Sequence, residues 1–239
     1  MIPKIIHYCW FGRGEMPEEA KKCIASWHKY MPDYEYKLWN EDNFDVDTVP
    51  YAREAYSAKK YAFVSDYVRL WALANTGGIY FDTDVEVLRP FDELLDHKAF
   101  AGFEGSKQSP LGTCVMASEP NGEWIKEQLD NYKDRHFIND DGTLDLTTNV
   151  DFITYKMVEQ GFVQNGMEQE YKDLHVFPVE YFSPRMTTWE YNRTDNTYSD
   201  HLGLGSWTNK DAGWKVKLGR IIGNKNMTRL IRIKRKITK

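Results

Sequence analysis

Residues 60–84 read KYAFVSDYVRLWALANTGGIYFDTD, and this stretch decides the fold. Apolar and aromatic side chains cover nearly the whole circumference of residues 60–76, which predicts a helix that is buried on all sides. Gly77-Gly78 ends this helix, because a left-handed cap favours a residue without a Cβ atom. Residues 79–81 then predict a short strand, which ends at the acidic loop Asp82-Thr83-Asp84.

Two charged residues, Asp66 and Arg69, lie three positions apart and therefore on one face of the predicted helix. One interpretation is a buried ion pair with a structural role. Such a pair is a weak source of stability, because the cost of removing two charges from water offsets their attraction. The other interpretation is a pair that opens onto a polar ligand. Asp66 would then accept hydrogen bonds from sugar hydroxyls, and Arg69 would donate to hydroxyls or phosphate.

The loop Asp82-Thr83-Asp84 places two carboxylates two residues apart at the end of a strand. Hard oxygen ligands of this kind suit Mg²⁺ or Mn²⁺, and such an ion in turn binds a diphosphate. Many loops contain Asp-x-Asp by chance, so the motif alone says little. Its position after a buried Asp/Arg helix and a Gly-Gly turn makes it specific. The sequence therefore predicts a metal and diphosphate site at this loop.

The remaining pattern indicates an α/β fold. Residues 3–10 are apolar and β-branched, residues 17–31 begin with proline and two glutamates, and residues 34–39 alternate as a strand does. This order of strand, helix and strand predicts a βαβ unit and parallel strands. Further strands are predicted at 99–103 and 113–117, and further helices at 122–134 and around 150–160. The polar residues 139–142 predict a loop.

The composition fits one domain with a substantial core, since 41 % of the 239 residues are hydrophobic. We expect this domain to span residues 1–214. Residues 215–239 carry ten Lys or Arg and no acid, which leaves 21 cations against 36 acids, or −15, in the domain. An acidic domain argues against a nucleic-acid partner. The basic tail has apolar residues at helical spacing and predicts either docking on an anionic membrane surface or a disordered solubilising end.

The cysteines and the first residues bear on localisation. Cys9, Cys23 and Cys114 form no CxxC pair, so a disulfide framework is not expected and a reducing compartment is favoured. The N-terminal residues lack the apolar core of a signal peptide, and no run of about 18 apolar residues predicts a membrane span. We therefore expect a cytoplasmic protein, peripheral on the inner face of the membrane if its basic tail docks there.

Three segments carry a family resemblance: residues 2–12 (IPKIIHYCWFG), residues 65–84 followed by Pro90, and residues 200–207 (DHLGLGSW). They resemble glycosyltransferase family 32, the DXD sugar-binding transferases, which include bacterial capsule and surface-glycan enzymes and the yeast initiating mannosyltransferase. More distantly they are similar to the catalytic domain of the clostridial glucosylating toxins. The resemblance implies a single-domain GT-A fold with a mixed central sheet, a UDP- or GDP-hexose donor, retention of anomeric configuration, and Mn²⁺ or Mg²⁺.

The resemblance also implies roles for residues at matching positions. Donor binding is implied for Tyr8, Trp10, Ser65, Asp66, Arg69, Tyr80, Asp82, Ser206 and Trp207. Catalytic roles are implied for Asp66, Arg69, Asp82 and Asp84, and metal binding for Asp82, Asp84 and His201. Relatives often have two adjacent histidines where this sequence has Asp200-His201, so the residue that completes the metal site stays open. Trp10 could instead be a core residue, and His201 an ordinary loop residue.

Three functions follow from these observations. The first is transfer of a hexose to a glycan or lipid-linked glycan, with acceptor contacts expected from residues 105–198 and in particular from Trp189 and Tyr191. The second is a haloacid-dehalogenase-like phosphatase, which would use Asp82 as nucleophile together with Asp84, although Glu86 departs from that motif. The third is a non-catalytic glycan-binding module that uses the aromatic residues.

Overall fold

The computed structural model describes residues 1–105, 110–187 and 190–204. The helices are α1 (Glu18–Tyr30), α2 (Pro50–Ser57), α3 (Tyr61–Thr76), α4 (Glu123–Asp130) and α5 (Asn149–Val158), with short 3₁₀ turns at Val46–Thr48 and Asp92–Leu94. The strands are β1 (Ile5–Cys9), β2 (Glu35–Trp39), β3 (Gly78–Phe81), β4 (Val85–Val87), β5 (Ala99–Phe103), β6 (Leu111–Ser118), β7 (Gln169–Tyr171), β8 (Leu174–Phe177), β9 (Arg185–Thr187), β10 (Glu190–Tyr191) and β11 (Ser199–His201).

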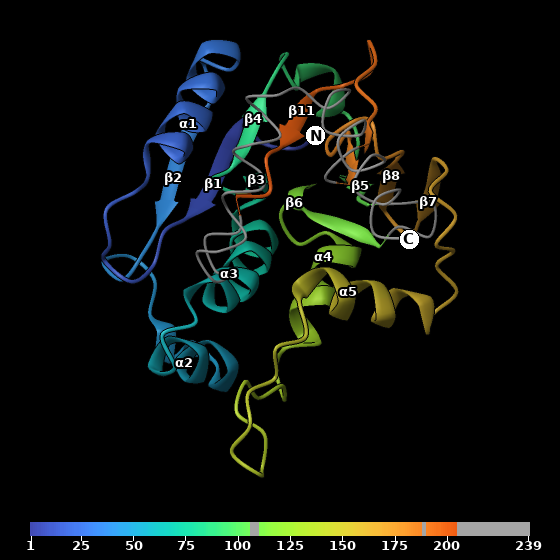
Figure 1. Ribbon diagram of the computed structural model, residues 1–239. Helices are drawn as coiled ribbons and strands as arrows, with labels where there is room; N and C mark the ends of the chain where they lie inside the picture. The colour runs from blue at the N-terminus through green and yellow to red at the C-terminus, as the bar shows by residue number, and fades with distance from the viewer. Residues whose placement is uncertain (106–109, 188–189, 205–239) are drawn as a thin grey trace, which may run out of the picture.

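A seven-stranded mixed sheet, in the order β2-β1-β3-β6-β5-β8-β7, forms the centre of the molecule (Figure 1). Strand β1 pairs in parallel with β2 and β3, and β5 pairs in parallel with β8. Strand β6 runs antiparallel between β3 and β5, and β7 is an antiparallel edge strand. The predicted α/β fold with a mixed central sheet is therefore confirmed.

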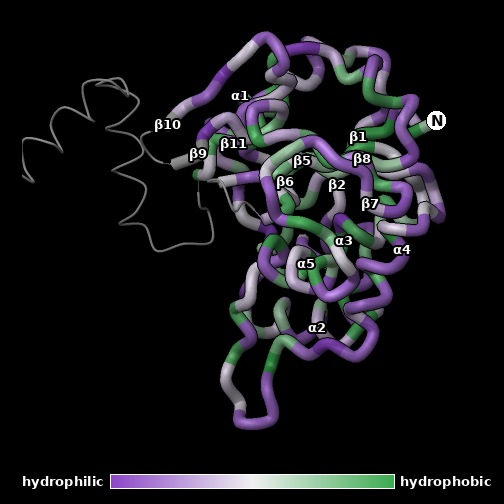
Figure 2. The backbone as a smooth tube through the Cα atoms, turned by 90° about the vertical axis from the view of Figure 1, so that its right-hand side faces the viewer, coloured by the Kyte–Doolittle hydropathy of each residue, from purple (hydrophilic) through white to green (hydrophobic). Residues whose placement is uncertain are grey.

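The two faces of the sheet pack against different cores. Along β3, Tyr80 faces one core while Ile79 and Phe81 face the other, because successive side chains of a strand point to opposite faces. The first core lies under α2, α3, α4 and α5, and the second lies under α1 and β4. The connection between α4 and α5 projects away from the sheet, and its tip is hydrophilic (Figures 1 and 2).

The Gly-Gly turn after α3 determines how β3 enters the sheet. Gly77 has φ +69° and Gly78 has φ +117°, a region that residues with a Cβ atom rarely adopt. A Cβ atom on Gly78 would lie 2.5 Å from the carbonyl oxygen of Ile5, and one on Gly77 would lie 2.6 Å from Pro120. The two glycines therefore allow α3 to end against its own sheet, so that the acidic loop follows directly at the end of β3.

The acidic loop continues into β4, which pairs antiparallel with β11 outside the main sheet. In this pairing His201 lies opposite Val85, and Asp200 lies opposite Glu86. The indole Nε1 of Trp27, on α1, donates to the carbonyl oxygen of Val85 at 2.7 Å and fixes β4 from the other side. This small second sheet brings residues about 120 positions apart in the sequence to the same loop.

Most predicted elements are present with small shifts of their ends, but α2, β4 and the individual strands β7 to β11 were not predicted. All three cysteines are buried. In the described part of the chain, no helix combines the length and apolar character that crossing a membrane requires. The basic tail from 215 to 239, together with Trp189, Ser206 and Trp207, lies outside the described residues.

Candidate active site

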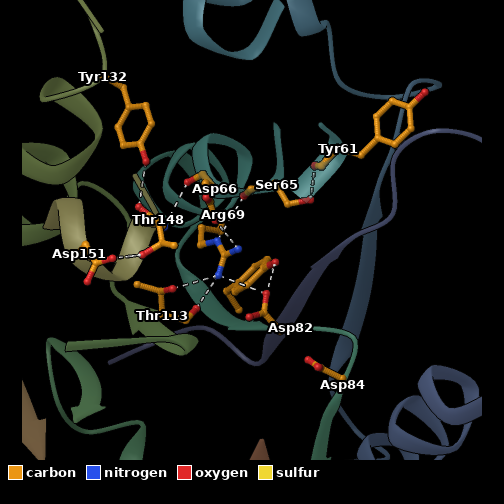
Figure 3. Close-up of polar contacts among 12 residues, drawn as sticks. Tyr61, Ser65, Asp66, Arg69, Asp82, Asp84, Thr113, Tyr132, Thr148 and Asp151 are labelled. Atoms are coloured by element: carbon orange, nitrogen blue, oxygen red, sulfur yellow. Dashed lines mark hydrogen bonds and ion pairs between the residues drawn. The ribbon is translucent and has the colours of Figure 1, made fainter. Parts of the chain in front are cut away.

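Arg69 is the centre of a buried charge cluster at the junction of α3, β3 and β6 (Figure 3). Its guanidinium donates to Oδ1 of Asp66 at 2.8 Å and to the carbonyl oxygen of Thr113 at 2.7 Å, and it lies 3.2 Å from Oδ1 of Asp82. It also lies over the ring of Tyr80, 4.6 Å from the centroid. Arg69 thus joins the helix carboxylate to the first aspartate of the acidic loop, with most of its donors already used by the protein.

Exposure increases from Arg69 outwards. The side chain of Arg69 is 6 % exposed, that of Asp66 is 12 % exposed and that of Asp82 is 26 % exposed. A ligand would therefore meet the two carboxylates before the guanidinium. Because its side chain is the least exposed of the three, Arg69 is better placed to hold Asp66 and Asp82 in position than to contact a ligand directly.

Burial changes the acidity of this cluster. Loss of hydration raises the pKa of Asp66 to about 6, even though the neighbouring Arg69 favours the charged form. Burial alone would lower the pKa of Arg69, but the charges of Asp82, Tyr80 and Asp66 hold it well above its ordinary value. Arg69 is therefore a permanent cation, while Asp66 changes its charge in the range of mildly acidic pH.

Asp82 is held by both its side chain and its backbone. The hydroxyl of the fully buried Tyr80 donates to Oδ1 of Asp82 at 2.9 Å, and the backbone N–H of Asp82 donates to the carbonyl oxygen of Cys114 at 2.9 Å. Since Oδ1 also faces Arg69, the described residues leave Oδ2 of Asp82 without a hydrogen-bond partner. This free oxygen is the atom that can bind a ligand.

Asp84 lies beside His201 through the β4–β11 pairing. The Nε2 atom of His201 is 3.3 Å from Oδ1 of Asp84, while the backbone N–H of Leu204 donates to Oδ2 at 2.8 Å. Burial opposes ionisation of Asp84, but the charge and hydrogen bond of His201 lower its pKa overall. Burial also opposes protonation of His201, yet Cys114 and Asp84 raise its pKa well above the ordinary value.

Asp82, Asp84 and His201 form a donor set that fits a divalent metal ion. One ligand atom from each lies within 4.8 Å of the others. Two carboxylate oxygens and one imidazole nitrogen suit Mn²⁺ particularly well, because this ion accepts hard oxygen ligands and also binds imidazole. These three side chains would hold the ion, which would supply positive charge next to a bound diphosphate.

The structure indicates which member of the Asp200-His201 pair reaches the acidic loop. Asp200 is buried on the opposite face of β11, where Nε and Nη2 of Arg185 donate to its two oxygens at 2.7 and 2.6 Å. The hydroxyl of Tyr191 lies 3.3 Å from the same carboxylate. Asp200 is thus fully occupied, and His201 is the residue near Asp84.

The remaining expected donor-binding residues of the described chain lie around this cluster. Trp10 is partly exposed just after β1, and its indole donates to the carbonyl oxygen of Gly14 at 2.7 Å. Tyr8 packs edge-on against Trp27, with ring centroids 5.4 Å apart. The hydroxyl of Ser65 donates to the carbonyl oxygen of Tyr61 at 3.2 Å, one turn earlier in α3. Both Trp10 and Tyr8 are partly exposed, and Tyr8 also packs against the core under α1.

Two residues of the site, Thr113 and Glu104, were not predicted from the sequence. Thr113 contributes its backbone carbonyl to Arg69, and a backbone group leaves no trace in a residue pattern. Glu104 follows the apolar strand β5, and one of its carboxylate oxygens lies within 4.8 Å of Cys114 Sγ and a ring nitrogen of His201. Burial raises the pKa of Glu104. A charged residue directly after a fully buried strand is the only feature that could have indicated it.

The sheet order and the position of the acidic loop at a strand end fit a GT-A-type fold. The solved structure called "PaToxG Glycosyltransferase" is similar in fold, with a TM-score of 0.51 and 20 % identity over 67 % of this chain and 70 % of that one. Residues 17–101 match the family described as "Glycosyltransferase sugar-binding region containing DXD motif". This segment is therefore similar to that family, in agreement with the resemblance noted in the sequence.

Two curated relatives are fungal proteins. The chain is 32 % identical to "Mannosyl phosphorylinositol ceramide synthase SUR1" of Saccharomyces cerevisiae over 139 residues, which are 56 % of this chain and 35 % of the relative. It is 38 % identical to "Inositol phosphoceramide mannosyltransferase 3" of Schizosaccharomyces pombe over 118 residues, which are 46 % of this chain and 31 % of the relative. The matched segments thus span about one third of each relative.

Proposed function

We propose that the protein transfers a hexose from a UDP- or GDP-sugar to a hydroxyl group of a glycan or lipid-linked glycan, with Mn²⁺ or Mg²⁺ and with retention of anomeric configuration. The observation that carries this proposal is the continuous cluster in which Arg69 links Asp66 to Asp82. At its open end, Asp82 meets Asp84 and His201. One sugar diphosphate could therefore contact the helix carboxylate and the metal-binding residues together.

Each side chain has a distinct part in the proposed reaction. Asp66 accepts hydrogen bonds from hydroxyls of the donor sugar, while Arg69 holds Asp66 and Asp82 in place. Asp82, Asp84 and His201 would hold the ion, which would supply positive charge for the diphosphate. In a front-face displacement the leaving diphosphate takes the proton of the acceptor hydroxyl, so no protein nucleophile is required. Positioning and charge stabilisation are then the enzyme's contribution.

The names of the relatives favour particular substrates. Both names include a mannosyl group and an inositol-containing ceramide. We therefore place a mannosyl donor and a polyol carried on a lipid first among the candidates, ahead of the capsular or surface polysaccharide acceptor suggested by family 32. In support of an interfacial acceptor, residues 215–239 carry ten cations, each worth about 1 kcal/mol near an anionic lipid surface. We propose a cytoplasmic, peripheral location for the protein on this basis.

Hydrolysis of a panel of UDP- and GDP-sugars with Mn²⁺ tests the proposal. We expect release of nucleoside diphosphate from one donor, and a loss of about 10²–10³-fold in the Asp84→Ala variant, because a preorganised electrostatic contact is removed. Glu86→Gln is the matched control, since Glu86 is an exposed acid on β4, two residues after Asp84. Full metal-dependent activity in Asp84→Ala would show that the metal site is assigned wrongly.

Two further measurements separate the alternatives. A phosphatase that uses Asp82 as nucleophile would hydrolyse p-nitrophenyl phosphate, whereas the proposed transferase would not. A glycan-binding module would show no thermal shift with UDP or GDP and Mn²⁺, whereas a ligand that binds only the folded state raises the melting temperature. Binding of a nucleoside diphosphate without hydrolysis of p-nitrophenyl phosphate supports the transferase.

A further inference from the structure

An irregularity in the pairing of β5 and β6 shapes the part of the site that β6 forms. Ala101 pairs with Met116, but its neighbour Gly102 pairs with Gly112, so three residues of β6 have no counterpart on β5. Such bulges re-aim side chains and are common beside active sites. The three residues of β6 without a counterpart include Thr113, whose carbonyl oxygen accepts from Arg69, and Cys114, which lies close to His201.

Glu104 lies directly beyond this bulge, at the end of β5. Its backbone N–H donates to the carbonyl oxygen of Pro110 at 3.1 Å, which fixes the start of its side chain. The space beside it exists because residue 112 is glycine. A Cβ atom on Gly112 would lie 3.2 Å from both Cβ and Oε2 of Glu104, and 3.1 Å from the carbonyl oxygen of Gly102. The fold therefore leaves room for this carboxylate.

The carboxylate of Glu104 has no hydrogen-bond or ion-pair partner in the described part of the chain, although it is only partly exposed. The charges that act on it include His201, Asp82 and Arg69. Its position relative to the metal-binding residues is informative. Glu104 groups with Cys114 and His201, whereas Asp82 and Asp84 group with His201 separately. Glu104 therefore adjoins the cluster at His201, and in the described part of the chain it forms no hydrogen bond or ion pair with the α3 residues that would hold the donor sugar.

A carboxylate in this position has the chemistry of a hydroxyl-binding group. An ionised carboxylate only accepts hydrogen bonds and offers about four acceptor positions, so adjacent hydroxyls of a sugar or inositol ring are suitable ligands. A partly buried carboxylate without a hydrogen-bond donor costs free energy. We therefore expect a substrate hydroxyl to supply the missing donor. Asp66, which would hold the donor sugar, is joined to Asp82 through Arg69, whereas Glu104 groups with His201.

We propose that Glu104 forms an acceptor subsite, where it binds a hydroxyl of a ring polyol and orients the acceptor toward the donor sugar. This inference rests on the proposed function and adds the residue that selects the acceptor. It separates two activities that a glycosyltransferase can show. Hydrolysis, in which water replaces the acceptor, needs only the donor and metal residues, whereas transfer also needs Glu104.

The Glu104→Gln variant tests this separation, with methyl hexosides and inositol as acceptor probes and the best nucleotide-sugar as donor. We expect hydrolysis without acceptor to keep its kcat, its KM and its Mn²⁺ half-saturation within about twofold. The KM for the acceptor should rise about 10- to 100-fold, as expected when a charged hydrogen bond is lost. Glu86→Gln on β4 is the control, and should leave both activities unchanged.

Several outcomes would overturn the inference. Unchanged acceptor KM in Glu104→Gln would show that the carboxylate does not bind the acceptor. A shifted Mn²⁺ half-saturation in hydrolysis would make Glu104 a metal ligand instead. If no ring polyol changes turnover by the wild type, the subsite does not take this class of ligand. If Glu104→Gln does not fold, Glu104→Asp replaces it in the same test. A wild type that hydrolyses no nucleotide-sugar would instead overturn the proposed function itself.

Discussion

The site has two halves that are built in different ways. The helix half comprises Asp66, Arg69 and Asp82, which come from one continuous stretch of sequence and bind one another. The strand-pair half comprises Asp84 and His201, which meet only because β4 pairs with β11. In the helix half each charge depends on a buried neighbour, so a substitution should affect both stability and activity. In the strand-pair half a single contact of 3.3 Å joins the two side chains, so a substitution should mainly affect ligand binding.

The largest expected effect is that of Arg69→Ala in the helix half. Loss of the guanidinium leaves Asp66 and Asp82 close together without their shared cation, and breaking a buried ion pair costs about 3–5 kcal/mol. Urea unfolding should show this loss, and nucleotide-sugar hydrolysis should disappear. Arg13→Ala is the control, because the Arg13–Asp42 pair is exposed and solvent screening leaves such a pair little effect on stability. If the two variants unfolded at the same urea concentration, the carboxylates of the helix half would not depend on Arg69.

A smaller loss of activity is expected for Asp200→Asn, because Asp200 supports the strand-pair half without contacting the acidic loop. Asp200 does not reach the loop, but its contacts with Arg185 hold β11 and therefore His201. Loss of such a supporting contact typically lowers metal affinity about 10- to 100-fold. The measurement is the Mn²⁺ concentration for half-maximal hydrolysis, taken well below the melting temperature. An unchanged Mn²⁺ requirement would show that β11 holds His201 without Asp200.

The two halves also differ in how far the sequence could predict them. Residues 60–84 contain their own periodicity, glycine turn and carboxylates, so the helix, its burial and the acidic loop could all be predicted. The strand-pair half depends on a strand of three residues, Val85–Val87, which is too short to show a pattern. Nothing local could decide between Asp200 and His201, because neighbouring residues of a strand point to opposite faces.

The residues that were missed have a common physical cause. Thr113 acts through its carbonyl oxygen, and Glu104 depends on a bulge and on the absence of a side chain at Gly112. Both are properties of strand register, which is set by pairing across the sheet and not by the residue itself. Local chemistry therefore predicts the residues that the chain presents in one stretch, while three-dimensional pairing determines the rest.

The activity that depends on the helix half should change with pH. Burial raises the pKa of Asp66 to about 6, and the proposed role needs the ionised carboxylate. Hydrolysis should therefore fall below pH 6, to about one tenth of its maximum at pH 5. Saturating Mn²⁺ is required, because protonation of His201 competes with metal binding. Measuring hydrolysis without an acceptor removes any contribution of Glu104 to the fall in rate at acidic pH. A rate that stays constant down to pH 5 would contradict the role of Asp66.

Stability should change with pH in the opposite direction. The pKa of Asp66 is higher in the folded state than in the unfolded state, where the ordinary value is 3.8. Protonated Asp66 therefore stabilises the fold below about pH 4, and this contribution is lost as pH rises through 6. Compared with Asp66→Asn, the wild type should lose stability between pH 4 and pH 7 while its activity increases. If both quantities rose together, the ionised carboxylate would be favourably bound in the free protein, and the helix half would be a structural ion pair.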